Sequence, residues 1–493
     1  MNLVCVCLDT FRADLVGKDE KLGFVDTPNL DEFVSNSIVF DEAFGECQPT
    51  LQMRRAFFTG KRSFPWRYNF DRRGHWHHAA GWHKIPPDQD TLAEILLSQG
   101  YMTGFISDTY HMFKPTMNYT RGFVTYDFIR GQESDNWKGG NIGELEKKLE
   151  KYVDHSRAKI LYAGLIQYLL NIQNRKSEED YFCAQVFSRS AEWIEENQSN
   201  QPFFLWIDSF DPHEPWDPPA EYADRYCPNY DGKDYIFGRP PIDASEKVLE
   251  RMKALYYGEV TLVDKWFGRF MEKLDDLGLR DDTIIIVLSD HGTQLLDHGR
   301  FGKGMEEMHP FNTRIVWYLY HPNEPHGRHV RSLVQGHDVM PTILDLLHVP
   351  IENLDGESVW PLVVGEKEEI RNHAVIAWAG WSSGPAIGRV SVRDSEWNYV
   401  CTIGKVDPET ELYHLPSDPE EKRNIVSEHT EVTAKQRRRV ESVLGQPLPG
   451  RMIELCDLSL SPFHEYLLRK NRTTVEQTYE LFKDIQRERN AKK

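Results

Sequence analysis

The sequence opens with MNLVCVCLDTFRADLVG (residues 1–17), in which an uninterrupted apolar run ends at Asp9. Far along the chain, DDTIIIVLSDHGTQLLDHG (residues 281–299) repeats this design, because its apolar run leads directly into Asp290 and His291. Unbroken Val, Ile and Leu runs are typical of parallel strands that are buried on both faces. Open α/β sheets bind their ligands just beyond the carboxyl ends of such strands. The two stretches therefore predict that two strands deliver these three polar side chains to one edge of a sheet.

Two carboxylates and one imidazole at one sheet edge would form a mixed oxygen and nitrogen site for a divalent cation. An oxygen-rich site with a single histidine fits Ca²⁺, Mg²⁺ or Mn²⁺ better than Zn²⁺. For either strand taken alone, an Asp that merely caps the following helix is an equally good interpretation. The occurrence of the pattern in two strands favours the metal site.

Composition and charge narrow the class of protein. The chain has 493 residues, of which 40% are hydrophobic, so it can bury a large core and we expect two domains. The formal net charge of −19 argues against nucleic acid as a partner. The first apolar run is too short to span a bilayer, and no basic segment precedes it, so we expect neither a signal peptide nor a membrane partner. Without a signal peptide we expect a cytoplasmic location and reduced thiols, and the seven scattered cysteines show no metal-ligand spacing.

The order of predicted elements indicates an α/β fold. Strand-like runs alternate with helical patterns through residues 1–371, which predicts a mostly parallel sheet with helices on both faces. Residues 144–198 hold long helical periods that form an insert in this catalytic domain. Residues 372–493 read as short antiparallel strands followed by charged amphipathic helices at 431–444 and 463–491, which predicts a smaller α+β C-terminal domain.

The stretch CQPTLQMRRAFFTGKR (residues 47–62) carries a candidate nucleophile. Its pattern predicts a helix with Thr50 in the first turn and Arg54 four residues later. A helix N-terminus favours developing negative charge, an arginine can hold that charge, and a metal ion can lower the pKa of a hydroxyl. The alternative is that Thr50 serves only as the N-cap of this helix, a role that is compatible with nucleophilic chemistry.

Taken together, these motifs resemble the sulfatase family of the alkaline-phosphatase superfamily, over nearly the whole chain. The resemblance rests on segments that occur in the family's order: LDTFRAD, the FFTG that ends the helix, PHEPW, SDHG with FGKG, MPTILDLL, DGESVWPL and ELYHLPSDPEEKRNI. It implies an alkaline-phosphatase-like sheet that is mostly parallel and flanked by helices, with a smaller α+β C-terminal domain. It also implies an enzyme that hydrolyses ester bonds.

One departure from the family concerns the nucleophile. Sulfatases carry a Cys or Ser, oxidised to formylglycine, in a C-x-P-S-R motif that starts nine residues before the Thr of an LTG segment. Counting back nine positions from Thr59 gives Thr50, and Arg54 then occupies the Arg position of the motif. Cys47 starts a similar C-Q-P-T-L, but Leu51 stands where the motif requires Arg. We therefore expect Thr50 as the nucleophile and no formylglycine.

A second departure concerns the metal. Many members of the family have paired Asp residues at the first half-site, whereas Thr10 follows Asp9 here. The resemblance then implies one divalent ion with the ligands Asp9, Asp290, His291 and Thr50, as in the phosphonate-ester and phosphodiesterase-like branch.

The resemblance also implies an anion-binding shell. Lys303 in HGRFGKG and His213 in DPHEPW match family residues that contact the ester group, and the histidine can protonate the leaving group. His111 matches a substrate-binding histidine, and Thr109 stands where the family has a lysine. We assign Thr50, Arg54, His213 and Lys303 to catalysis and the other two residues to substrate binding.

These expectations combine into one function with two alternatives. The chain is predicted to be a metal-dependent hydrolase that cleaves sulfate or phosphate esters through a Thr50 ester, which water then hydrolyses. The substrate is a small anionic ester, such as a sulfated or phosphorylated sugar or an aryl or alkyl ester. A phosphodiesterase or phosphonate monoester hydrolase with the same site is the first alternative. An inactive sulfatase fold that binds an anionic glycan is the second. Homo-oligomerisation is left open.

Overall fold

The computed structural model describes most of the chain. The described residues are 1–16, 25–66, 81–113, 117–133, 135–152, 162–241, 243–324, 327–350, 352–379, 387–406 and 409–450. The helix expected at 463–491 lies outside these residues.

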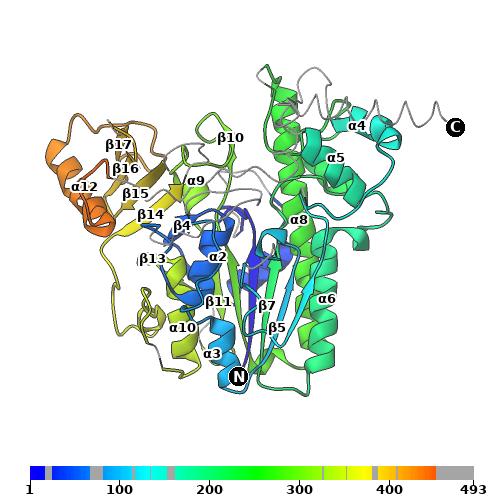
Figure 1. Ribbon diagram of the computed structural model, residues 1–493, viewed down its shortest axis with the longest axis horizontal. Helices are drawn as coiled ribbons and strands as arrows, with labels where there is room; N and C mark the ends of the chain where they lie inside the picture. Colours follow the sequence, from blue (N-terminus) through cyan, green and yellow to red (C-terminus); the bar gives the residue numbers. More distant parts are fainter. Residues whose placement is uncertain are drawn as a thin grey trace.

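Within the described residues, eight strands form the main sheet in the order β12-β2-β11-β8-β1-β7-β5-β6 (Figure 1). Their bounds are β1 Asn2–Leu8, β2 Ile38–Phe40, β5 Met102–Ser107, β6 Thr125–Phe128, β7 Phe203–Ser209, β8 Thr283–Ser289, β11 Trp317–Tyr320 and β12 Arg328–Val330. Neighbouring strands are parallel except where β11 pairs with β8 and β2. The predicted mostly parallel sheet is confirmed.

Strand β1 lies in the middle of this sheet, between β7 and β8. Leu3, Cys5 and Cys7 pack into the hydrophobic cluster on one face of the sheet. The alternate residues Val4 and Val6 pack into the cluster on the opposite face, since successive side chains of a strand point to opposite sides. Burial on both faces explains why the strand reads as an unbroken apolar run.

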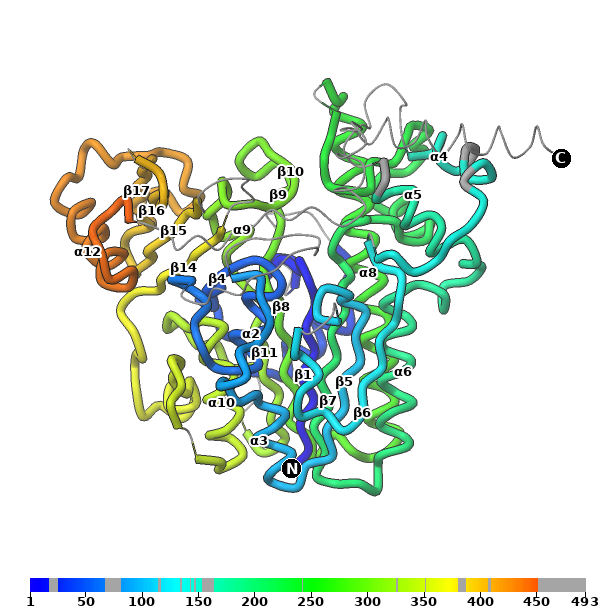
Figure 2. Tube along the Cα trace, viewed as in Figure 1, coloured from blue at the N-terminus to red at the C-terminus, as the bar shows by residue number. Residues whose placement is uncertain are grey.

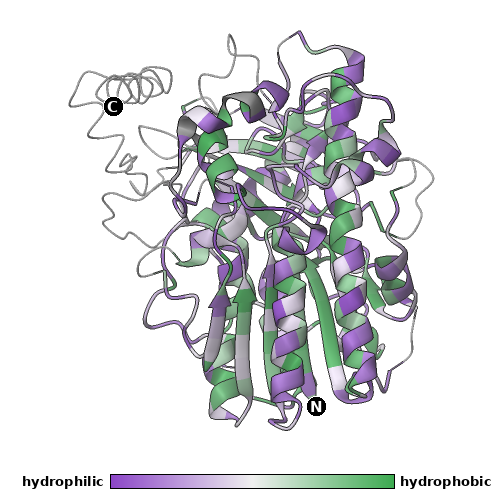
Figure 3. Cartoon of the chain, turned by 90° about the vertical axis from the view of Figure 1, so that its right-hand side faces the viewer, coloured by the Kyte–Doolittle hydropathy of each residue, from purple (hydrophilic) through white to green (hydrophobic). Residues whose placement is uncertain are grey.

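Helices cover both faces of the sheet (Figures 1 and 2). One layer contains α2 (Thr50–Thr59), α3 (Leu92–Ser98) and α10 (Val339–Leu346). The other contains α1 (Pro28–Ser35), α6 (Phe182–Asn197) and α8 (Glu246–Asp276). The central strands β1, β7 and β8 are buried along their whole length, whereas the outer helices carry hydrophilic residues on their outward sides (Figure 3). None of the helices in the described ranges is both long and apolar enough to cross a bilayer.

Helices are present in the predicted insert as α4 (Glu146–Tyr152), α5 (Tyr162–Asn171) and α6, but α6 packs on β5 and β7 and belongs to the layer that covers the sheet. The remaining short elements are β3 (Ala43–Phe44), β9 (Gln294–Leu295), β10 (Phe301–Gly302), β13 (Val334–Gln335), α7 (Ala220–Tyr226), α9 (Pro310–Thr313), α11 (Trp360–Val363) and the 3₁₀ turns Tyr110–Phe113, Ile142–Leu145, Glu178–Asp180, Arg280–Asp282 and Gly336–Asp338.

A second sheet has five strands in the described residues, in the order β17-β16-β15-β14-β4. Their bounds are β4 Cys47–Gln48, β14 Ala374–Ala379, β15 Gly388–Arg393, β16 Trp397–Ile403 and β17 Thr410–His414, and α12 (Thr430–Leu444) packs against β15 and β16. Strand β4 comes from the N-terminal part of the chain and pairs in parallel with β14. This pairing joins the segment before α2 to the C-terminal sheet. The domain boundary at 371/372 stays a prediction.

Glu46 connects the segment before α2 to the segment after it. Its carboxylate is 1% exposed and accepts hydrogen bonds from the backbone N–H groups of Ser63 (2.9 Å) and Phe64 (2.8 Å). Burial raises the pKa of Glu46 from 4.5 to about 7, although these two donors oppose the shift. The folded protein therefore holds a proton on Glu46 that the unfolded chain releases at a lower pH.

The Glu46→Gln variant tests this shift. Between about pH 5 and 7 Glu46 binds more protons in the folded protein than in the unfolded chain, so its contribution to the free energy of unfolding falls as pH rises. Glutamine does not titrate in this range. The free energy of unfolding of the variant minus that of the wild type should therefore rise with pH, by at most about 1.4 kcal/mol per pH unit. Urea unfolding of both proteins at pH 5, 6 and 7 measures this difference. A difference that stays constant over this range would contradict the raised pKa.

Candidate active site

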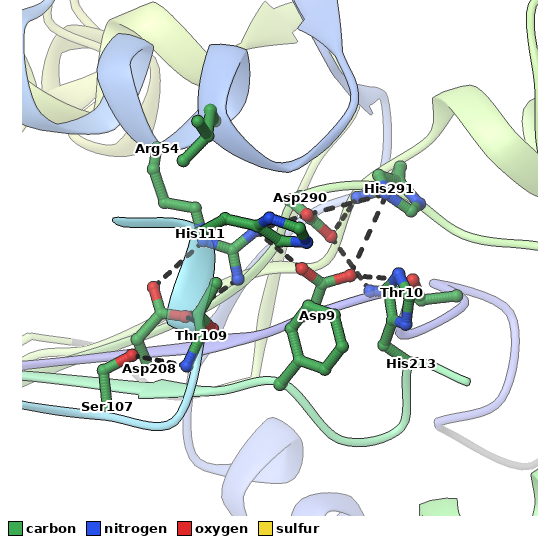
Figure 4. Close-up of polar contacts among 12 residues, drawn as sticks. Asp9, Thr10, Arg54, Ser107, Thr109, His111, Asp208, His213, Asp290 and His291 are labelled. Carbon is green, nitrogen blue, oxygen red and sulfur yellow. Dashed lines mark hydrogen bonds and ion pairs between the residues drawn. The ribbon is translucent and has the colours of Figure 1, made fainter. Parts of the chain in front are cut away.

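The site lies where β1, β7 and β8 end. Leu8 pairs with Ser289 on β8 and with Ser209 on β7. The residues that follow Leu8 and Ser289, namely Asp9 and Asp290, therefore leave their strands at the same level. Carboxyl ends of neighbouring parallel strands meet at one edge of a sheet, which is where open α/β folds bind ligands. The strand ends thus bring the predicted acidic pair together (Figure 4).

Asp9, Asp290 and His291 form the cluster predicted from the two strand ends. One ligand atom of each lies within 4.8 Å of the others, and all three side chains are fully buried. His291 Nδ1 donates to the Gly292 carbonyl over 2.8 Å, so its Nε2 carries the free lone pair. Within the described residues Nε2 has no hydrogen-bond partner.

The electrostatics of this cluster fit a divalent cation. Burial lowers the pKa of His291 to about 4, which keeps its imidazole in the neutral form that binds metals. Burial and the adjacent carboxylate of Asp290 raise the pKa of Asp9 well above its usual value. A bound cation would relieve the repulsion between the two carboxylates, and the three side chains would supply oxygen and nitrogen ligands for it.

Arg54 extends from α2 to this acidic cluster (Figure 4). Its guanidinium lies 2.9 Å from Asp9 Oδ2 and also pairs with Asp290 Oδ2. Asp208, on β7, accepts two further bonds from Arg54, at 2.8 and 3.1 Å. Because none of the four side chains is exposed, the arginine is the cation that compensates this group of buried carboxylates.

Thr50 is the first residue of α2 and is 3% exposed. Pro49 is the N-cap, so the interpretation that Thr50 serves only as the N-cap was wrong. Residues four apart on a helix lie on the same face, which places Thr50 on the face that bears Arg54. Thr50 therefore lies one helical turn before the residue that reaches the carboxylates.

Cys47 lies in a different environment. It belongs to β4, is completely buried in the hydrophobic core, and accepts a hydrogen bond from Trp66 Nε1 over 3.2 Å. Burial raises the pKa of its thiol well above the usual value. The thiol is thus part of the packing beneath α2.

Lys303 reaches the site through Thr10. Its Nζ lies 2.9 Å from Thr10 Oγ1 and 2.9 Å from Glu214 Oε2. Thr10 in turn donates from its hydroxyl to Asp9 (2.8 Å) and from its backbone N–H to Asp290 (2.9 Å). Thr10 has a φ of 62°, a left-handed conformation that is uncommon for residues other than glycine and often marks functional sites.

The predicted catalytic His213 and the predicted substrate-binding His111 both lie next to one aromatic ring. Phe210 stacks on His213 at 4.0 Å between centroids and lies 6.0 Å from His111. His213 Nδ1 donates to the Glu214 carbonyl, and burial lowers its pKa, so Nε2 of the neutral ring is the atom that can take up a proton. His111 Nε2 lies 3.4 Å from Glu133.

Thr109 contacts Asp208, one of the carboxylates that bind Arg54. Its hydroxyl donates to Asp208 Oδ1 over 2.7 Å, so it supports the carboxylate that holds Arg54. The predicted substrate contact of Thr109 stays a prediction.

Three residues of the site were not identified from the sequence. Asp208 follows the apolar run of PFFLWIDS (residues 202–209), which is like the runs before Asp9 and Asp290, and this signal was available. Glu214 and Phe210 flank His213 but carry no local pattern that distinguishes them from other loop residues.

Comparisons with known proteins identify the family of this chain. The family model described as Sulfatase matches residues 1–349. The model described as N-sulphoglucosamine sulphohydrolase, C-terminal, matches residues 297–446.

Two of the similar curated proteins are arylsulfatases. An arylsulfatase of Clostridium perfringens is 25% identical over 468 residues, which are 86% of this chain and 90% of that protein. Arylsulfatase K of Bos taurus is 26% identical over 238 residues, which are 46% of this chain and only 41% of that protein.

Solved structures show the same fold. The phosphonate monoester hydrolase of Agrobacterium radiobacter matches with a TM-score of 0.66 and 19% identity, over 90% of this chain and 95% of that one. A protein in complex with its substrate D-glucosamine-2-N,6-O-disulfate matches with a TM-score of 0.67 and 17% identity, over 90% of this chain and 97% of that one.

The predicted resemblance and fold class are thus confirmed. Because the Sulfatase model matches well over half of the 493 residues, and the relatives are ester hydrolases, the chain belongs to the sulfatase family of ester-hydrolysing enzymes.

Proposed function

We propose that this enzyme hydrolyses small sulfate or phosphate esters, with Thr50 as the nucleophile and one divalent ion as cofactor. The observation that carries the proposal is the position of Thr50 at the N-terminus of α2, one turn before Arg54, which contacts both Asp9 and Asp290. The buried, core-packed position of Cys47 supports a mechanism without formylglycine.

The reaction takes two steps. The Thr50 hydroxyl oxygen forms a bond to sulfur or phosphorus, the bond to the ester oxygen breaks, and the leaving alcohol gains a proton. Water then attacks the sulfur or phosphorus of the Thr50 ester, which releases sulfate or phosphate and returns a proton to Thr50. His213 Nε2 is the group that exchanges protons in these steps, and the helix N-terminus and Arg54 stabilise the negative charge.

Asp9, Asp290, His291 and Thr50 would hold the divalent ion, for which Ca²⁺, Mg²⁺ and Mn²⁺ are better candidates than Zn²⁺. When bound, such an ion lowers the pKa of a coordinated hydroxyl and polarises a substrate oxygen. Lys303 and His111 supply the remaining contacts to the anion. Thr109 is proposed as a further substrate-binding residue. The free, buried cysteines of the described residues support a reducing, cytoplasmic location.

A second candidate is a phosphodiesterase or phosphonate monoester hydrolase that uses the same residues. It is favoured by the likeness to phosphonate monoester hydrolases, including that of Silicibacter pomeroyi, which matches with a TM-score of 0.67 and 19% identity. An anion-binding protein without activity is the third candidate, and the retained acidic cluster with Arg54 argues against it.

Rapid-quench peptide mass spectrometry tests the nucleophile directly. During turnover of an aryl sulfate or aryl phosphate, we expect an adduct of about 80 Da on the Thr50 peptide and an unmodified Cys47 peptide. The substrate that leaves the adduct identifies the ester class. A Cys47 peptide with the mass of formylglycine would refute the Thr50 mechanism, and no turnover of any sulfate, phosphate or phosphonate ester would favour the binding protein.

Removing the hydroxyl of Thr50 provides a second test. Thr50→Ala should lower kcat by a factor on the order of 10³ or more, because no other group takes over the attack, whereas Thr50→Ser should retain turnover. Thr59→Ala is the matched control, since Thr59 lies at the other end of α2 and its hydroxyl donates to the Arg55 carbonyl over 2.7 Å. Equal losses in the Thr50→Ala and Thr59→Ala proteins would indicate an effect on folding instead of on the nucleophile.

Metal removal tests the acidic cluster. We expect chelation to abolish activity and Ca²⁺, Mg²⁺ or Mn²⁺ to restore it. At a free concentration 100 times its Kd, the ion should stabilise the fold by about 2.7 kcal/mol, which thermal unfolding detects without any substrate. In the Asp290→Asn protein this stabilisation should largely disappear. A metal-dependent shift of Tm that survives this substitution would place the ion elsewhere.

A further inference from the structure

Lys303, the predicted anion-binding lysine, is paired with a carboxylate. Its Nζ lies 2.9 Å from Glu214 Oε2, and the two side chains are only 13% and 19% exposed. The partners come from different parts of the site, because Glu214 follows β7 and Lys303 follows β10. The pair therefore bridges the loop that carries His213 and the hairpin beside the acidic cluster.

Glu214 holds the neighbouring histidine as well. Its backbone carbonyl accepts the hydrogen bond from His213 Nδ1, and its Oε2 lies 3.5 Å from the same nitrogen. One residue thus fixes the ring orientation of His213 and, through its carboxylate, the position of the Lys303 ammonium group. On the other side, the Thr10 hydroxyl holds Lys303 at 2.9 Å.

The carboxylate of Glu214 is ionised at neutral pH. Burial acts to raise its pKa, but the adjacent His213 ring and the charge and hydrogen bond of Lys303 outweigh burial and lower the pKa of Glu214 to about 2. Lys303 consequently faces the site with most of its positive charge compensated. An uncompensated lysine attracts a dianion about twice as strongly as a monoanion, whereas a neutral ion pair hardly distinguishes them.

We propose that Glu214 is a positioning residue that neutralises Lys303 and thereby makes the site select esters with one negative charge over esters with two. Sulfate monoesters and phosphodiesters carry one charge near neutral pH, and phosphate monoesters carry two. The proposal rests on the proposed function, since it concerns the same site and names the charge class of its substrate.

The Glu214→Gln variant tests the proposal, because glutamine retains an oxygen for Lys303 but removes the charge. We measure kcat/KM for 4-nitrophenyl phosphate and 4-nitrophenyl sulfate at pH 8, where the leaving group is the same and the ester charge differs. If the phosphate is not turned over, its inhibition constant against sulfate hydrolysis replaces kcat/KM. The phosphate-to-sulfate ratio should rise by about tenfold or more in the variant.

Glu178→Gln is the matched control. Glu178 pairs with Lys265 at 2.8 Å and its side chain is 18% exposed, but this pair lies between the Glu178–Asp180 turn and α8, away from the site. The control should leave the ratio unchanged. Lys303→Met alone should lower the ratio, because it removes the positive charge that Glu214 compensates.

A ratio within about twofold of the wild-type value would overturn the proposal, since a merely structural role of Glu214 would lower both rates together. A ratio that does not fall in the Lys303→Met protein would overturn it too. If Glu214→Gln does not fold, Glu214→Asp, which shortens the reach of the carboxylate, should shift the ratio in the same direction to a smaller extent. Failure of the wild type to hydrolyse either ester would instead count against the proposed function itself.

Discussion

The guanidinium of Arg54 lies among three carboxylates that come from three neighbouring strands, and the site is organised around it. Asp9 and Asp290 follow β1 and β8, and Asp208 lies on β7. Carboxylates buried this deeply repel one another, and removing the cation from such a group typically costs about 3–5 kcal/mol. The arginine therefore holds the strand ends together and fixes the end of α2 against them.

Thr50 lies one turn before Arg54 on α2, a helix whose ten residues are all buried. The segment before the helix is held by the pairing of β4 with β14. The C-terminal sheet thus contributes to the site indirectly, by positioning the start of α2, the helix that carries Arg54.

A network of hydrogen bonds surrounds Arg54 and its three carboxylates. Thr10 connects Asp9 and Asp290 to Lys303, and Glu214 connects Lys303 to His213. The connected side chains differ in function but share hydrogen bonds, so the charge on one alters what the next presents to a substrate. Selectivity between ester classes in this fold can therefore depend on residues that do not carry out the chemistry.

The sequence by itself determined the class of fold and the central acidic cluster. A strand that is buried on both faces must be apolar throughout, so the polar residue that ends it, such as Asp9 or Asp290, is visible locally. Asp208 ends a similar run and could have been found in the same way. Only the tertiary structure decided that Arg54 joins these carboxylates, that Glu214 neutralises Lys303, and that β4 joins the C-terminal sheet. Each of these contacts links residues far apart in the chain, and local patterns carry no information on which distant segments become neighbours.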